Sequence, residues 1–212
     1  LYSLRCIMKK ILNRSLLGIG LLAIGAFLVL QFVRPQAFNS EEKVQRFERN
    51  LVDVKSFLQK HPSYNQEVVF MVDMRIPSNY NRFFVYEVSK NKISHKGLVA
   101  HGKGSNTRVK DSLQFSNVEG SNMTSLGNYK VGASYIGRFG KSYKLHGLDK
   151  TNDQAFARYV VLHTYTFMPH EEQLVPILNS KGCPMVSNET FKILEKIIDN
   201  SEKPNLLRIY YK

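Results

Sequence analysis

The chain has 212 residues, a net charge of +13 and 43% hydrophobic residues. Two cysteines are too few for a disulfide-rich fold, and the length after the first 37 residues suits one domain with its own core. Neither a His-x-His nor an HExxH pair occurs, so we expect no metal site, no zinc chemistry and no other cofactor.

The chain opens with a basic flank and an uncharged apolar run. Lys9, Lys10 and Arg14 precede residues 16–33, which carry no charge and are just long enough to span a bilayer as a helix. Basic residues on one side predict a cytoplasmic N-terminus and an exported, periplasmic or otherwise extracytoplasmic remainder. We expect an uncleaved anchor in the cytoplasmic membrane; a cleaved signal peptide and a buried core helix are the alternatives.

The exported part keeps a positive charge. Five of the 30 basic residues and none of the 17 acidic residues precede Phe38, which leaves 25 basic against 17 acidic residues and a charge of +8. Such a charge attracts anionic partners. Cell wall or lipid headgroups suit an exported domain, whereas nucleic acid is not an expected partner. Simple solubility is an equally good reason for the same charge.

An amphipathic helix is the first element expected after the apolar run. In residues 40–60 apolar side chains recur at intervals of three and four, which is the period of one helix face. Glu41 and Glu42 suit the N-terminus of such a helix electrostatically. We therefore assign residues 1–37 to a signal or membrane anchor and residues 38–66 to a linker and this helix.

The pattern after residue 62 is that of β-strands. Six segments are rich in β-branched and aromatic residues and are separated by turn residues. They cover residues 67–74, 82–88, 92–102, 127–135, 143–148 and 157–167. The last of them is apolar enough to be buried on both faces.

A second helix and a last strand are expected near the end of the sequence. Residues 188–200 place apolar side chains on one helix face, and Ser187 or Asn188 could cap that helix. The apolar and aromatic pattern of residues 205–211 predicts a strand. The sequence therefore predicts a mainly β domain over residues 67–212, with flanking helices.

Cys183 stands between Gly182 and Pro184 and is the only cysteine of the exported part. Without a partner for an internal disulfide, it is an inert core residue, an intermolecular link or a nucleophile. Its place on a bend before a helix favours the nucleophile, because the helix dipole should favour the thiolate and converging backbone N–H groups suit an oxyanion hole. His163 in the 157–167 segment is the candidate base, and a satisfied core histidine is the alternative.

The spacing of these residues resembles a known signature. His163, sixteen further residues and Ser180-Lys181-Gly182-Cys183 resemble the H-x(14–17)-[ST]-x-G-C pattern of YkuD-type L,D-transpeptidases. Upstream fragments from "VVFMVDM" through "HGKGS" and "GNYKVG" to "ARYVVLH" follow in the order of the murein L,D-transpeptidase catalytic domain. The match covers most of residues 68–187. It implies a β-sandwich-type catalytic domain whose cysteine attacks a peptidoglycan stem peptide.

The resemblance also implies a role for each residue of the signature. Cys183 would be the nucleophile and His163 the general base. Ser180 and Gly182 would shape the turn, with backbone N–H groups at or beside Cys183 as the oxyanion hole. Four basic residues are candidates for binding the carboxylates of the stem peptide, although an exposed basic side chain is more often only solvated: Lys103, Lys130, Arg138 and Lys181.

The chain departs from the family pattern at three places. Lys181 stands where most members have histidine, and Thr164 stands where many have glycine after the catalytic histidine. The run 184–186 replaces an Arg or Asn often found shortly after the cysteine. These changes bear on substrate preference and efficiency, while formation of an acyl-thioester remains chemically possible.

The expected function is that of a monomeric L,D-transpeptidase-like acyltransferase. It would crosslink or remodel peptidoglycan stem peptides through a thioester on Cys183. One alternative is an L,D-carboxypeptidase or another cysteine peptidase, in which water resolves the thioester. The other is a non-catalytic wall-binding module, which would not need Cys183 and His163 together.

Overall fold

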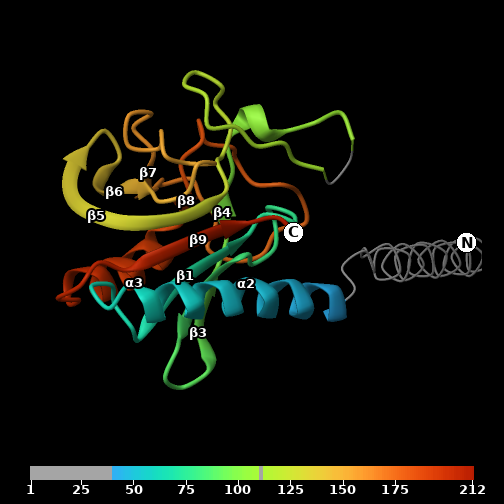
Figure 1. Ribbon diagram of the computed structural model, residues 1–212. Helices are drawn as coiled ribbons and strands as arrows, with labels where there is room; N and C mark the ends of the chain where they lie inside the picture. The colour runs from blue at the N-terminus through green and yellow to red at the C-terminus, as the bar shows by residue number, and fades with distance from the viewer. Residues whose placement is uncertain (1–39, 110–111) are drawn as a thin grey trace, which may run out of the picture. The chain divides into compact units, whose positions relative to one another are not determined.

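The computed structural model describes residues 40–109 and 112–212 (Figure 1). These residues form two α-helices, one short 3₁₀ helix and nine strands. In chain order the elements are α2 (Ser40–Lys60), β1 (Val68–Asp73), β2 (Phe83–Glu87), β3 (Lys92–Gly97), β4 (Val99–Ala100), η1 (Lys103–Ser105), β5 (Gly127–Gly137), β6 (Gly140–Gly147), β7 (Val161–Thr164), β8 (Met185–Val186), α3 (Asn188–Asp199) and β9 (Leu206–Tyr210). The mainly β character with two helices confirms that part of the predicted fold.

The predicted anchor over residues 16–33 lies outside the described residues. Among residues 40–109 and 112–212, the structure contains no helix with the length and apolar character that a membrane span requires.

The nine strands form one sheet in the order β3-β2-β1-β9-β5-β6-β7-β8-β4. Only Leu98 separates β3 from β4, yet these two strands lie at opposite ends of that order. Consecutive Cα atoms are about 3.8 Å apart, so the end of β3 and the start of β4 lie within about 8 Å of each other. The sheet therefore curls until its two edges approach, and Figure 1 shows β5 to β8 lying over β9 and β1.

The main core lies inside this curled sheet. Alternate residues of β1 and β2 belong to it because successive side chains of a strand point to opposite faces. The helix α3 contributes Phe191 and Leu194 to the same core. The fully buried members from the strands include Phe70, Val72, Phe83, Val85, Val99, Tyr129, Leu145 and Leu162.

The helix α2 covers the outer face of β2 and β1. The ring of Phe47 packs edge-on against Phe84 at 5.6 Å and against Tyr86 at 5.8 Å, and these residues alternate along β2 with the core-facing ones. A buried ion pair joins the same helix to the end of β1, with Arg46 Nε 2.9 and 3.1 Å from the carboxylate oxygens of Asp73. The predicted helix over residues 40–60 is confirmed.

Two predicted strands are shorter in the structure. The 92–102 segment divides at Leu98, because its two parts join opposite edges of the sheet. The 157–167 prediction is wrong outside Val161–Thr164. Just before this strand, Tyr159 adopts a left-handed backbone with φ +56°, which interrupts an extended chain. The cap of α3 is confirmed, since the Ser187 side chain accepts a hydrogen bond from the Thr190 N–H.

Candidate active site

A tight turn over residues 180–184, here called the Cys183 turn, carries the candidate nucleophile. Gly182 has φ +120°, a conformation that side chains rarely adopt. The Ser180 hydroxyl accepts a hydrogen bond from the Gly182 N–H at 3.0 Å and donates one to the Cys183 carbonyl at 2.7 Å. Ser180 therefore holds the backbone of the turn through hydrogen bonds to both Gly182 and Cys183.

The Cys183 turn is held against the segment that follows β4. The Ser180 N–H donates to the His101 carbonyl at 2.9 Å, and the Lys103 N–H donates to the Ser180 carbonyl at 2.8 Å. Between them Gly102 lies so close that a Cβ would be 2.2 Å from the Asn122 carbonyl oxygen and 2.8 Å from the Gly182 Cα. Gly102 is thus required for the close packing of this backbone against the Cys183 turn.

The strand β7 places His163 beside the Cys183 turn. Its N–H donates to the carbonyl of Pro184 at 3.3 Å, and β7 then pairs in parallel with β8, with His163 opposite Met185. This pairing brings together two residues that are twenty positions apart in the sequence. It brings the backbone of His163 against the residues that directly follow Cys183.

The imidazole of His163 is fixed in one tautomer. Its Nδ1 lies 2.9 Å from the Thr164 carbonyl oxygen, and a carbonyl only accepts, so Nδ1 carries the proton and Nε2 has a free lone pair. The residue is only 4% exposed, and burial lowers its pKa although the bond to Thr164 acts in the opposite direction. His163 is therefore neutral at pH 7, as a general base must be.

An aromatic ring covers the imidazole. Phe139, in the turn between β5 and β6, stacks on His163 with the ring centroids 4.7 Å apart. The guanidinium of Arg138 lies 5.7 Å from the centroid of the Phe139 ring. Sequence reasoning selected Arg138 and missed Phe139, because only the pairing of β6 with β7 brings this turn to His163.

The thiol of Cys183 is partly buried and faces the backbone just before β7. Its Sγ donates a weak hydrogen bond of 3.7 Å to the Tyr159 carbonyl. Burial raises the pKa of the thiol, whereas a backbone hydrogen bond with Val161 and the charge of Arg158 lower it. The helix α3, whose dipole was expected to favour the thiolate, starts at Asn188, five residues after Cys183.

The four predicted basic residues lie in different places. Lys181 and Lys103 are exposed, the first in the Cys183 turn and the second in the segment bonded to it. Arg138 approaches His163 through Phe139, as described above. Lys130 lies on β5, opposite His146 of β6 and Leu206 of β9, and no interaction found among the described residues joins it to the Cys183 turn.

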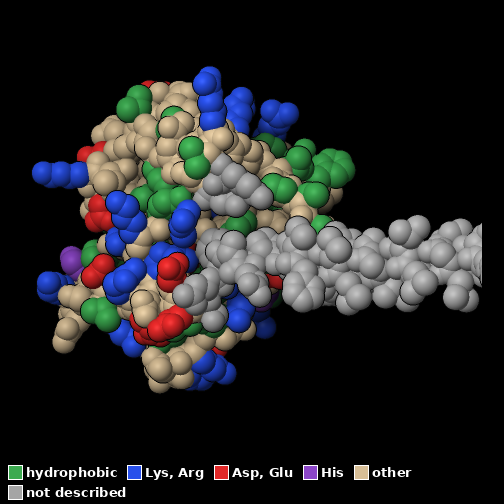
Figure 2. All heavy atoms as spheres, turned by 90° about the vertical axis from the view of Figure 1, so that its right-hand side faces the viewer, with side chains coloured by type: hydrophobic (Ala, Val, Ile, Leu, Met, Phe, Trp, Pro, Cys, Tyr) green, Lys and Arg blue, Asp and Glu red, His purple; other side chains and the backbone are tan. Residues whose placement is uncertain are grey.

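Lys and Arg side chains are dispersed on the face shown in Figure 2. In the lower left of this view they stand among acidic side chains, and a separate group lies at the top, so they do not form one continuous basic patch. On this face, the charge pattern does not single out a surface for a large anionic partner.

A buried polar network supports the segment behind the Cys183 turn. His101 Nδ1 accepts a hydrogen bond from Arg82 Nη2 at 2.9 Å, and its Nε2 lies 2.7 Å from the Asn106 side-chain oxygen. Burial and the charge of Arg82 lower the pKa of His101 to about 4. The fully buried Arg82 also donates to the Val99 carbonyl. His101 is therefore a satisfied structural histidine rather than a candidate base.

The family to which the chain belongs follows from its match to a family model. The model described as the L,D-transpeptidase catalytic domain matches residues 39–210, which is most of the chain. The chain is a member of this family. The expected resemblance is thus confirmed.

Solved structures similar to this L,D-transpeptidase domain are distant in sequence. The helical cell shape determining protein Pgp2 from Campylobacter jejuni has 12% identity and a TM-score of 0.46, covering 69% of this chain and 48% of that chain. An L,D-transpeptidase from Mycobacterium smegmatis has 12% identity and a TM-score of 0.41, covering 68% and 58%. The L,D-transpeptidase from Xylanimonas cellulosilytica has 14% identity and a TM-score of 0.38, covering 68% and 60%. The chain thus spans about half the length of the first of these structures. No curated protein matches the chain.

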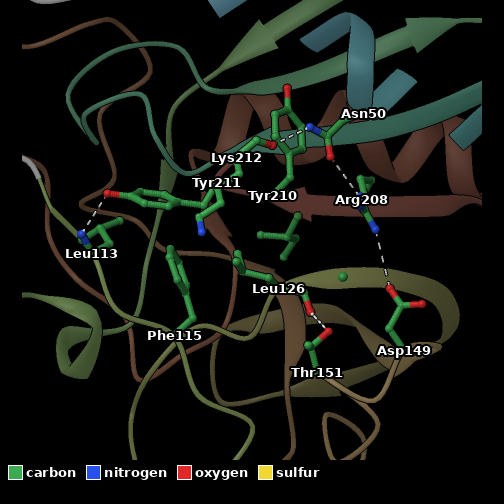
Figure 3. Close-up of a pocket in the computed structure, with 12 residues that line it drawn as sticks. Asn50, Leu113, Phe115, Leu126, Asp149, Thr151, Arg208, Tyr210, Tyr211 and Lys212 are labelled. Atoms are coloured by element: carbon green, nitrogen blue, oxygen red, sulfur yellow. Dashed lines mark hydrogen bonds and ion pairs between the residues drawn. The ribbon is translucent and has the colours of Figure 1, made fainter. Parts of the chain in front are cut away.

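A pocket of about 630 Å³ in the L,D-transpeptidase domain lies away from the candidate nucleophile (Figure 3). Its polar wall contains Arg208, whose guanidinium is 3.6 Å from Asp149 and 3.7 Å from Asp53. None of the predicted site residues lines this pocket, whose walls are Asn50, Leu113, Phe115, Leu126, Gly127, Asp149, Thr151, Arg208, Ile209, Tyr210, Tyr211 and Lys212. The polar contacts of Arg208 join α2, β9 and the loop after β6. Arg208 therefore has a structural role in the wall of this pocket.

Proposed function

We propose that this chain is a cysteine-dependent acyltransferase that acts on peptidoglycan stem peptides through a thioester on Cys183. The observation that supports the proposal is the hydrogen bond from the His163 N–H to the carbonyl of Pro184, the residue after Cys183, which is the only cysteine among the described residues. Membership of the L,D-transpeptidase family supports the substrate class. Transfer to an amine would crosslink or remodel the wall.

The first half of the reaction forms the thioester. The Nε2 lone pair of His163 takes the thiol proton, because Nδ1 is already bonded to the Thr164 carbonyl. The Cys183 sulfur leaves the Tyr159 carbonyl and attacks the carbonyl carbon of the third stem-peptide residue, a diamino acid. When the tetrahedral intermediate collapses, the C–N bond breaks and the terminal D-amino acid leaves with the proton that His163 held.

The second half releases the acyl group. An amine of a neighbouring stem peptide attacks the thioester, gives its proton to His163 and forms the crosslink. The sulfur then leaves as a thiolate and recovers the proton. Water in place of the amine gives the free tripeptide, which is the carboxypeptidase alternative. Two steps through a covalent intermediate replace a single difficult step.

The oxyanion needs a backbone donor on the Cys183 turn. The Gly182 N–H already donates to the Ser180 hydroxyl, so it is not free to bind an oxyanion. We therefore assign this role to the N–H of Cys183 itself. Removal of one such donor typically costs about 3–4 kcal/mol of transition-state stabilisation.

We also propose roles for the residues and segments around the site. The exposed Lys103, Lys181 and Arg138 would bind carboxylates of the stem peptide, and Lys130 is the weakest candidate because of its position on β5. The uncharged run 16–33 would anchor an exported monomer to the cytoplasmic membrane, within an organisation of anchor (1–37), linker and helix (38–66) and catalytic domain (67–212).

Mass spectrometry with a tetrapeptide donor tests the proposal. We expect an adduct on Cys183 equal to the tetrapeptide less its last residue, followed by crosslinked dimer or free tripeptide. The same thiol should react with a carbapenem. Cys183→Ser should form neither the peptide adduct nor the carbapenem adduct. His163→Ala should form the peptide adduct far more slowly, while its melting temperature stays near that of the wild type. Absence of both adducts from a folded, reduced protein would favour the wall-binding alternative.

A further inference from the structure

Arg158 forms four hydrogen bonds to a single segment of the chain. Its Nη1 donates to the Ser116 carbonyl at 2.9 Å and to the Ser125 hydroxyl at 3.3 Å. Its Nη2 donates to the Met123 carbonyl at 2.8 Å and to the Ser121 hydroxyl at 3.4 Å. The guanidinium therefore holds the segment 116–125 in one conformation.

The same guanidinium lies against the Cys183 turn. Its Nη2 is 3.7 Å from the position that a Cβ of Gly182 would occupy, and the Met123 carbonyl to which it donates is 2.9 Å from that position. The residue after it, Tyr159, provides the carbonyl that accepts the hydrogen bond from the Cys183 thiol. Arg158 thus lies against the residue before Cys183 in space, and in sequence it precedes the residue whose carbonyl binds the thiol.

The charge of Arg158 is not neutralised locally. All four partners of its terminal nitrogens are carbonyl or hydroxyl oxygens. Within residues 40–109 and 112–212, no carboxylate lies within 4.0 Å of this guanidinium. A fixed positive charge in a partly buried site acts strongly on a neighbouring ionisable group.

We propose that Arg158 is a positioning residue whose fixed charge favours the thiolate of Cys183 and whose hydrogen bonds hold the segment 116–125 beside the Cys183 turn. This inference rests on the proposed function, since it takes Cys183 to be the nucleophile. Arg158 does not bind the substrate carboxylate, because both terminal nitrogens already donate to the protein.

The electrostatics of the thiol agree with this role. Burial raises the pKa of Cys183, and Arg158 is the charged group that lowers it. The helix dipole that the sequence suggested as the activating charge is thereby replaced by a side chain from the turn before β7. Sequence reasoning missed Arg158 because it stands inside a segment that resembles a continuous buried strand.

The pH dependence of thiol alkylation tests the inference without any peptidoglycan substrate. The rate of iodoacetamide reaction with Cys183 would be measured against pH for the wild type, Arg158→Lys and Arg158→Gln. Lysine keeps the charge, and glutamine keeps a donor without the charge. Lys150→Met serves as the control, because it removes an exposed positive charge from the same turn region.

We expect Arg158→Gln to move the midpoint of the alkylation profile upward by about one pH unit, which slows alkylation at pH 7 about tenfold. Arg158→Lys should keep the midpoint near that of the wild type and lower the melting temperature, because lysine cannot make the four bonds. Lys150→Met should leave both unchanged. Equal midpoints for Arg158→Gln and the wild type would overturn the proposal.

A further variant keeps the test decisive if Arg158→Gln does not fold. Ser121→Ala combined with Ser125→Ala removes two of the four hydrogen bonds and leaves the charge in place. We expect this double variant to be less stable and to keep the wild-type midpoint of the alkylation profile. A midpoint shifted upward as far as that expected for Arg158→Gln would overturn the electrostatic role. A normal alkylation profile without any tetrapeptide adduct would reject the proposed function but not this inference.

Discussion

The ring of Phe139 lies almost parallel to the imidazole of His163, with the planes 21° apart and the centroids 4.7 Å apart. Phe139 is 41% exposed, so it separates the buried histidine from solvent. It thereby helps to keep the imidazole neutral and to hold its orientation. The turn between β5 and β6 thus takes part in the candidate site although it carries no chemically reactive group.

Replacement of Phe139 by alanine should therefore raise the pKa of His163. Burial disfavours the charged imidazole, and removal of the ring admits water that stabilises it. A raised pKa leaves less neutral base in mildly acidic solution, so the acid limb of the pH–activity profile should move to higher pH. The measurement is thioester formation against pH. Phe139→Tyr is the matched control and should keep the wild-type profile; an unshifted acid limb for Phe139→Ala would contradict the role of the ring.

Gly182→Ala should lose both stability and activity. The left-handed backbone at φ +120° costs about 1–3 kcal/mol for an alanine, and its Cβ would be 2.9 Å from the Met123 carbonyl oxygen. Chemical denaturation and the tetrapeptide assay measure the two effects. Gly120→Ala is the control, because Gly120 also has a positive φ but its Cβ would meet nothing within 4 Å. Equal losses in the two variants would show that the close contact at Gly182 has no effect.

The stability of the domain should fall in mildly acidic solution because of His101. Its folded pKa of about 4 lies below the ordinary value of 6.5, so the unfolded chain binds the proton first as the pH falls. The stabilisation is complete above about pH 6.5 and is lost towards pH 4. A pKa difference of about 2.5 corresponds to about 3 kcal/mol. The burial of His163 contributes in the same direction.

Urea denaturation between pH 7 and pH 4 measures this effect. His101→Gln should reduce the loss of stability over that interval, because glutamine can still accept from Arg82 and donate to Asn106 but does not titrate. A His101→Gln slope equal to that of the wild type would show that this histidine does not govern the acid response.

Arg46→Met should destabilise the fold far more than the exposed Arg49→Met. Removal of Arg46 breaks its buried ion pair with the Asp73 carboxylate, and breaking such a pair costs about 3–5 kcal/mol. Substitution of an exposed arginine is usually worth about 0.5 kcal/mol or less. Chemical denaturation compares the two variants. Similar unfolding free energies would mean that the pairing of α2 with β1 adds little to the domain.

Periodicity was sufficient to predict most elements of the fold but not the arrangement of the sheet. The helix over residues 40–60 and the strands containing Phe70 and Val85 follow from local patterns of apolar side chains. The division of residues 92–102 between opposite edges of the sheet could not be predicted, because apolar spacing gives no information about which strands pair. The left-handed Tyr159 was missed because only its surroundings impose that conformation.

The candidate site was predictable only as far as its reactive groups. Residue type and spacing selected Cys183 and His163, whose roles stay proposals. The orienting group for the imidazole is a backbone carbonyl, that of Thr164, and a carbonyl is present at every position of a sequence. Phe139 and Arg158 act through stacking and hydrogen bonds that arise only when distant segments meet. The residues that support the reactive groups could therefore be identified only from the structure.

The position of β9 in the middle of the sheet has a consequence for the order of folding. β9 pairs with β1 on one side and with β5 on the other, and among the strands of residues 40–109 and 112–212 it alone joins β3-β2-β1 to the rest of the sheet. During synthesis, eight strands leave the ribosome before the strand that connects the two parts of the sheet. Until Leu206–Tyr210 is present, both β1 and β5 keep unpaired edges, which invite pairing with other chains. The pairing of β9 with β1 and β5 should therefore be the folding step that protects both edges from other chains.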